Sequence, residues 1–267
     1  MPAPIAVQLW TFRTEFEQDP EGVLDAIEHA GYAGVEMVHA LTAQGRSAAD
    51  RSALFEARGL AVPSCHVFLE SLDAERRGRA FEDVATLGAG YVVCAWIPPE
   101  RRRDADDYRR LAELLAEAGE EAQASGLRLA YHHHDFELRP IDGDRSGLDI
   151  VLEAVDPALM AVETDVYWLH VGGLDPVAEL ERLGDRCRLV HCKDHLAPDQ
   201  EAIAPDDEGV ARFNTVLGTG ILDFPAIVAA ARHAEWLIVE QDLSPSGPED
   251  TSRRSIAHLQ SVVAAVG

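Results

Sequence analysis

The sequence has few basic residues, no long hydrophobic run and no closely spaced cysteine pair. Lys and Arg together number 23 against 47 Asp and Glu, which gives a formal net charge of -24. Nucleic acids and anionic membranes are bound mainly through dense Lys and Arg, so this surface should repel both. We therefore expect no nucleic-acid partner and no membrane partner, and solubility is the simplest reason for the acidic excess.

No stretch approaches the roughly 18 uncharged apolar residues of a membrane span, so the sequence predicts no transmembrane helix. The opening residues, MPAPIAVQLW, lack the basic and long apolar regions of a signal peptide. The four cysteines (Cys65, Cys94, Cys187 and Cys192) have no CxxC spacing and lie in apolar runs. This pattern is typical of buried free thiols in a reducing compartment, and we expect a cytoplasmic protein.

The chain does contain short apolar runs that alternate with longer amphipathic ones along its 267 residues, of which 47% are hydrophobic. Eight runs have the length and composition of strands. They are residues 5–10, 34–38, 61–67, 91–96, 127–134, 159–165, 188–194 and 236–242. Helical patterns fill the gaps, and several begin with Asp or Pro and end near Gly, as in residues 173–184.

Eight strand–helix units without a linker predict a single (β/α)8 TIM barrel over residues 1–267. A doubly wound open sheet is the alternative, but it would normally carry a Gly-rich phosphate turn early in the chain. The first turn, WTFRTEFEQDPEG, has none. The longest irregular segment, 195–218, follows the seventh strand run and is a candidate lid over the barrel mouth.

A barrel enzyme places its catalytic groups at the carboxyl ends of the strands, and polar residues gather at those ends here. They are Gln8, Trp10, Glu36, His66, Trp96, His132, His133, His134, Glu163, Asp165, His191, Lys193, Asp194, Glu240 and Asp242. Asp165 alone could cap a helix, Glu240 could pair with an arginine, and His191 could be a core histidine. Ionisable groups on four consecutive strand ends together indicate a polar site.

Carboxylates and an imidazole that converge from neighbouring strands suit one hard or borderline divalent ion: Mn, Mg, Co or Zn, with Mn favoured. A structural zinc site is disfavoured because no pair of thiolates lies at the strand ends. Cys192 alternates with His191 and Lys193, so its side chain should point away from the barrel axis.

The segments YHHHDFE, VETDVYW, LVHCKD, LGTGILDFPAI and WLIVEQD, in this order and spacing, resemble the sugar phosphate isomerase/epimerase family. This family has a xylose isomerase-like TIM barrel and includes inosose dehydratases and ketose epimerases. The resemblance covers essentially the whole chain. It implies a single divalent ion held by Glu, Asp, His and Glu from strands five to eight, with substrate oxygens completing the shell.

The resemblance assigns three ligands by position: Asp165, His191 and Glu240. The first ligand departs from the pattern, because His132 stands where many relatives have a glutamate. The nearest carboxylate is Glu137, which we favour over His132 because three carboxylates and one His suit a hard ion. Lys193 matches a lysine of the dehydratase branch, whereas Trp168 stands where that branch has a histidine.

The chemistry that the resemblance implies is proton abstraction from a carbon next to a carbonyl, with the metal stabilising the developing charge. His132 and His134 share a face of their strand, and His134 is the preferred base. His133 points to the other face. Lys193 is a candidate proton donor, and its alternative role is a structural ion pair with Asp194 or Glu163. Glu163 is either an orienting carboxylate for a ligating histidine or a second acid/base.

The remaining candidate substrate contacts are Trp10, Trp96, Trp168, His66 and His132, although any of the tryptophans could also fill the core. The sequence thus predicts a metal-dependent isomerase, epimerase or dehydratase-type lyase for a sugar, keto-sugar or cyclitol. The alternative is a non-catalytic barrel subunit that binds a sugar or a metal. The substrate, the metal and the oligomeric state, including a homo-oligomer, stay open.

Overall fold

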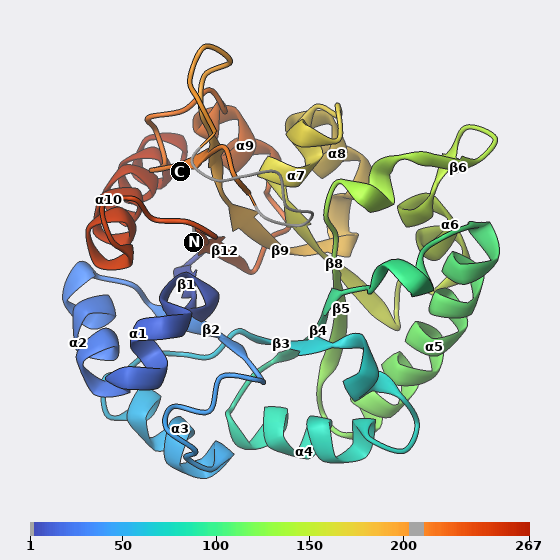
Figure 1. Ribbon diagram of the computed structural model, residues 1–267, viewed down its shortest axis with the longest axis horizontal. Helices are drawn as coiled ribbons and strands as arrows, with labels where there is room; N and C mark the ends of the chain where they lie inside the picture. The colour runs from blue at the N-terminus through green and yellow to red at the C-terminus, as the bar shows by residue number, and fades with distance from the viewer. Residues whose placement is uncertain (1–2, 203–210) are drawn as a thin grey trace.

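Eight parallel strands close into a barrel at the centre of the molecule (Figure 1). The structure is a computed structural model that describes residues 3–202 and 211–267. Its barrel strands are β1 (Ile5–Gln8), β2 (Gly34–Val38), β3 (Ser64–Phe68), β4 (Tyr91–Trp96), β5 (Arg128–His132), β8 (Met160–Asp165), β9 (Cys187–Cys192) and β12 (Trp236–Val239). Closure comes from β1, which pairs in parallel with both β2 and β12. The predicted (β/α)8 barrel is confirmed.

Helices form a ring around the strands (Figure 1). They are α1 (Arg13–Gln18), α2 (Pro20–Ala30), α3 (Ala48–Glu56), α4 (Arg77–Thr86), α5 (Ala105–Ala124), α6 (Gly147–Ala154), α7 (Val166–Val171), α8 (Pro176–Leu183), α9 (Phe224–Ala230) and α10 (Pro248–Val266). The last helix packs against both α9 and α2, which completes the ring. None of the helices in the described residues is long and apolar enough to cross a membrane.

Local sequence sets the helix ends as the capping rules expect. Asp175 accepts hydrogen bonds from the first N–H groups of α8 at 2.8 and 3.3 Å, and Gly184 ends that helix with a positive φ of 55°. Ser146 and Asp149 form a reciprocal capping box at the start of α6. These ends fix where each helix leaves the strand before it.

Alternation along the strands divides the interior into two cores. Outward-facing residues pack against the helices in the larger core, which includes Cys192 as predicted from its position next to His191. Inward-facing residues form a small apolar layer inside the barrel: Ala6, Tyr91, Val93, Ala130, Leu189 and Ile238. The next inward positions toward the carboxyl ends are polar. All four cysteines are buried and free, as the sequence predicted.

The connection after β9 begins with an ordered hairpin, β10 (Asp194–His195) against β11 (Asn214–Thr215). The Asp194 carboxylate accepts from the main-chain N–H groups of Gly218 and Gly220, both at 2.9 Å, and so folds the GTG turn. The candidate lid, 195–218, lies only in part within the structure, because residues 203–210 are outside the described residues.

A second small hairpin joins β6 (Pro140–Asp142) and β7 (Arg145–Ser146) between β5 and α6.

Candidate metal centre and active site

The strand register brings the polar strand ends to the same level at the barrel mouth. Asp165 is the register partner of His191 across β8 and β9, and His132 is the partner of Glu163 across β5 and β8. All four side chains are buried, with at most 3% of their surface exposed. Because burying several ionisable groups is costly, such a layer points to a function rather than to stability alone.

Asp165, His191 and Glu240 form the first of two overlapping groups that could hold a metal ion. Nδ1 of His191 lies 3.0 Å from Oε2 of Glu240 and 3.9 Å from Oδ2 of Asp165. Oδ1 of Asp165 accepts from the N–H groups of Tyr167 and Trp168 at the start of α7, whereas Oδ2 is buried without a hydrogen bond. Asp165 is therefore both a helix cap and an open ligand, and this chemistry fits a divalent cation.

His66, His132, Glu163 and His191 form the second group, which we call the deep group. Oε2 of Glu163 lies 2.6 Å from Nε2 of His66, 3.0 Å from Nδ1 of His132 and 3.2 Å from Nε2 of His191. In the described part of the chain, Oε1 of Glu163 has no hydrogen-bond partner, and the close contact of Nδ1 of His132 with Glu163 lacks the geometry of a hydrogen bond. The two groups share His191, and each group faces a different nitrogen of its ring.

Glu36 contacts His191, which belongs to both groups, although from the sequence it was expected only among the polar strand residues and had no role of its own. It is fully buried, and its Oε2 is 2.6 Å from Nε2 of His191. Burial raises the pKa of Glu36, but the imidazoles of His66 and His191 outweigh burial and lower it to about 2. Burial and the nearby Glu36 raise the pKa of Glu163 to about 7. The only feature of the sequence that indicated a special role for Glu36 was a carboxylate inside the apolar run GVEMV.

Lys193 is buried among carboxylates at the mouth. Its Nζ lies 2.8 Å from Oε2 of Glu240, 2.8 Å from Oδ2 of Asp242 and 3.4 Å from Oδ2 of Asp165. Burial lowers the pKa of Lys193, but these three carboxylates outweigh burial and raise it well above the usual value. Lys193 is therefore a charged donor, and its partners differ from the Asp194 or Glu163 considered from the sequence. Asp242 is a further residue that had been given no role.

The three histidines at the end of β5 lie on two faces of the strand, as the alternation predicted. The rings of His132 and His134 meet edge to face, with centroids 4.9 Å apart. His133 points to the other face, where its Nε2 accepts from the N–H of Asp165 at 3.3 Å. Burial, together with the charge of Lys193, lowers the pKa of His134 well below its usual value. Nδ1 of His134 is buried and forms no hydrogen bond with the described residues.

Glu137 belongs to neither group of possible ligands in the described residues. A short 3-10 turn (Phe136–Leu138) directs its carboxylate back under the strand tip. There it accepts from the hydroxyl of Tyr131 and from the N–H of His134, both at 2.8 Å. Burial raises the pKa of Glu137 to about 7. Its predicted role as a ligand has no support from this placement, and Glu137 instead fixes the backbone that carries His134.

Aromatic rings surround His134, and they include two of the predicted substrate contacts. The His134 ring lies 5.2 Å from Trp96 and 5.3 Å from Trp168, and Phe136 stacks on its face at 5.1 Å. Nε1 of Trp168 is buried, and no residue within 3–202 or 211–267 forms a hydrogen bond with it. Trp10 is placed elsewhere: it packs on the larger core, and the guanidinium of Arg13 lies 5.0 Å from its ring. His66 lies in the deep group rather than among these rings.

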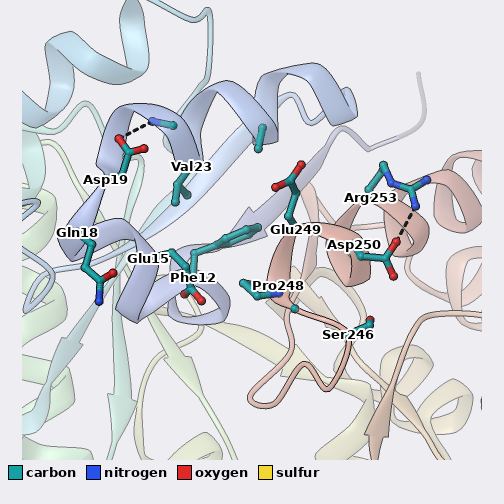
Figure 2. A pocket seen from close by; sticks show the side chains of 13 residues that line it. Phe12, Glu15, Gln18, Asp19, Val23, Ser246, Pro248, Glu249, Asp250 and Arg253 are labelled. Carbon is teal, nitrogen blue, oxygen red and sulfur yellow. Dashed lines mark hydrogen bonds and ion pairs between the residues drawn. The ribbon is translucent and has the colours of Figure 1, made fainter.

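A separate groove of about 730 Å³ lies between α1, α2 and the start of α10 (Figure 2). None of its lining residues belongs to either group of possible ligands. Its acidic side chains include Asp19, which caps α2 through Gly22, and Asp250, which pairs with Arg253 at 2.7 Å. We assign this groove no part in the site.

Comparison with known proteins agrees with the fold. The family model described as "Xylose isomerase-like TIM barrel" matches residues 24–262. An inosose dehydratase of Lacticaseibacillus casei is 28% identical over 149 residues, which are 53% of this chain and 49% of that protein. The chain thus spans about half the length of the curated relatives that it matches.

Two solved structures share the fold. One is a sugar phosphate isomerase/epimerase from Parabacteroides distasonis, with a TM-score of 0.79 and 23% identity over 97% of this chain and 94% of that one. The other is the IOLI protein with a binding zinc atom, with a TM-score of 0.74 and 15% identity over 99% of each chain. The chain belongs to the xylose isomerase-like TIM barrel family.

Proposed function

We propose that the protein is a divalent-metal-dependent isomerase, epimerase or dehydratase-type lyase. Its substrate would be a sugar, a keto-sugar or a cyclitol, and its chemistry would begin with removal of a proton next to a carbonyl. One observation carries the proposal: an open metal-ligand group, an imidazole with an unpaired buried nitrogen and a buried ammonium meet at the barrel mouth. The enzymatic nature of the inosose dehydratase relatives supports it.

Asp165, His191 and Glu240 would hold the ion. Two carboxylates and one imidazole suit Mn, Mg, Co or Zn, and we favour Mn because oxygen ligands predominate. When bound, the ion supplies positive charge where a substrate carbonyl gains negative charge in the transition state. The zinc atom bound by the IOLI protein supports a metal in a barrel of this fold but does not bear on which metal binds here.

His134 is the proposed base. Its lowered pKa keeps the imidazole neutral, and its Nδ1 is buried and unpaired, so it has a lone pair or a proton to share with a substrate. Glu137 holds the main-chain N–H of His134 at 2.8 Å, which fixes the base against the barrel.

Lys193 is the proposed acid, because its ammonium is charged and lies close to the same Trp168 ring as the base. The Trp168 ring centroid is 5.3 Å from the His134 ring and 5.4 Å from Nζ of Lys193. In a dehydration, His134 would take the carbon-bound proton and Lys193 would give a proton to the departing hydroxyl, which leaves as water. Glu163 faces three histidines, which supports its orienting role over a direct acid/base role.

The rings of Trp96 and Trp168 would line the pocket by contact with the C–H face of the sugar. The indole N–H of Trp168 has no hydrogen-bond partner among the described residues, so it could donate to a substrate hydroxyl. This arrangement suits an uncharged polyol better than a phosphate ester.

Hydrogen exchange tests the proposal without knowledge of the final product. Protein loaded with Mn²⁺ is incubated in D₂O with a panel of keto-sugars and inososes, and mass spectrometry reports deuterium at the carbon next to the carbonyl. We expect incorporation or water loss for at least one compound, and none with His134→Gln. Binding of a compound without exchange or product would instead support the non-catalytic alternative.

A further inference from the structure

Glu36 is buried next to His191, and both of its carboxylate oxygens accept hydrogen bonds. Oε2 accepts a hydrogen bond from the amide of Gln8 at 2.6 Å, and Oε1 accepts one from the hydroxyl of Ser64 at 2.5 Å. No part of Glu36 is exposed. A buried carboxylate is retained at such a cost only when its hydrogen bonds do something that an apolar residue cannot do.

The third partner of this carboxylate is His191. Its Nε2 lies 2.6 Å from the same Oε2 that accepts from Gln8. An amide nitrogen can only donate, so this oxygen acts as an acceptor and holds a hydrogen on the ring nitrogen that faces it. Nδ1 also faces a carboxylate oxygen, that of Glu240, but an ion between Asp165 and Glu240 would take the place of a hydrogen on Nδ1 and not of the one on Nε2. Oε2 of Glu163, at 3.2 Å, is a second acceptor on the same side of the ring.

The opposite nitrogen of the same ring faces the other group. Nδ1 of His191 is 3.0 Å from Glu240 and 3.9 Å from Asp165. A neutral imidazole has one N–H and one lone pair, so only one nitrogen can bind a metal. The two groups of possible ligands share this ring, and its orientation therefore decides between them.

We propose that Glu36 is a positioning residue that determines which nitrogen of His191 binds the ion. It holds the N–H on Nε2 of His191 and so presents the lone pair of Nδ1 to the ion between Asp165 and Glu240. The deep group then lacks its fourth ligand and serves as hydrogen-bonded support. The inference rests on the proposed function, because it requires an ion in the first group. Carboxylates that orient a ligating histidine in this way typically change metal affinity 10–100-fold.

The decisive measurement uses unmodified protein loaded with ¹¹³Cd²⁺ and labelled with ¹⁵N in its histidines. Long-range ¹H–¹⁵N correlation distinguishes the two ring nitrogens, and coupling to ¹¹³Cd identifies the one that binds. We expect a single cadmium-bound imidazole, bound through Nδ1, with its proton on Nε2. Cadmium bound through Nε2, or to several histidines, would overturn the inference and leave the metal itself in place. Protein that binds no cadmium would refute the proposed function as well.

Two variants give a second measurement. Glu36→Gln keeps an oxygen for Gln8 and His191, because the hydroxyl of Ser64 can accept from the new amide. Glu36→Leu removes the acceptor. Competition with a chromogenic chelator should show a 10–100-fold loss of Cd²⁺ affinity for the leucine variant and a loss under tenfold for the glutamine variant. A folded leucine variant with affinity within threefold of the unmodified protein would contradict the inference; if that variant fails to fold, the cadmium spectra decide.

Discussion

The ammonium of Lys193 lies against the oxygens that would bind the metal ion. Replacing Lys193 with a neutral residue should therefore make metal binding tighter. Its Nζ is 2.8 Å from Oε2 of Glu240 and 3.4 Å from Oδ2 of Asp165, the same oxygens that would hold the ion. An ion on these oxygens would lie within about 5 Å of the ammonium. At an effective dielectric constant near 20 and a separation of about 5 Å, the repulsion between the ammonium and a divalent ion is on the order of 7 kcal/mol.

The real penalty is smaller because Lys193 can turn toward Asp242, which is also 2.8 Å away. A remaining repulsion of about 1.4 to 2.8 kcal/mol corresponds to a factor of about 10 to 100 in metal affinity. We therefore expect Lys193→Met to bind Mn²⁺ 10–100-fold more tightly than the unmodified protein. Isothermal titration calorimetry measures this directly, and Lys193→Arg is the control that keeps the charge.

The same substitution should make stability depend on the metal. Without an ion, Lys193→Met leaves Asp165, Glu240 and Asp242 without their cation, and an unpaired buried charge typically costs about 3–5 kcal/mol. The melting temperature of the metal-free variant should fall, and Mn²⁺ should restore most of the loss. Weaker or equal Mn²⁺ affinity in a folded Lys193→Met variant would refute the placement of the ion beside Lys193.

Two further predictions concern the loop and the base. Asp194→Ala removes the acceptor of four main-chain N–H groups and should lower the free energy of unfolding in urea by about 3–5 kcal/mol. Asp223→Ala, which loses one helix-cap bond, should cost only about 1 kcal/mol, and equal losses would contradict the loop role of Asp194. His134→Gln should reduce turnover by about 10²–10⁴-fold while metal content stays unchanged. Full turnover in that variant would mean that another residue is the base.

The barrel could be predicted because each strand is a short apolar run that can be recognised on its own. The runs predicted at 34–38 and 91–96 have the bounds of β2 and β4, and the others differ by a few residues at their ends. Most of these errors lie at the carboxyl ends, where the sequence looks continuous but the chain leaves the ladder to form the site. His134 and Lys193 are two such residues: the alternation placed them at the mouth, although both lie beyond the paired strands.

The contacts between side chains within the site could not be predicted from the sequence. Alternation gives the face of a side chain, but not the partner that it meets across the barrel. Glu36 is 155 residues from His191, and only closure of the barrel brings them together. Glu137 was expected at the metal because a carboxylate was needed near strand five, yet the turn after β5 directs it to Tyr131. Such turns depend on packing around them rather than on local pattern.

The central claim is that Asp165, His191 and Glu240 hold one divalent ion. Elemental analysis of protein purified without chelator and dialysed against Mn²⁺ tests this claim, with Asp165→Asn as the variant and Asp242→Asn as the matched control. Both substitutions remove one buried negative charge near Lys193, but only the first removes an atom of the proposed ligand set. We predict one equivalent of metal in the unmodified protein and in Asp242→Asn, and less than 0.1 equivalent, a loss of roughly tenfold or more, in Asp165→Asn. Equal metal content in the two variants, or none in the unmodified protein, would contradict the account.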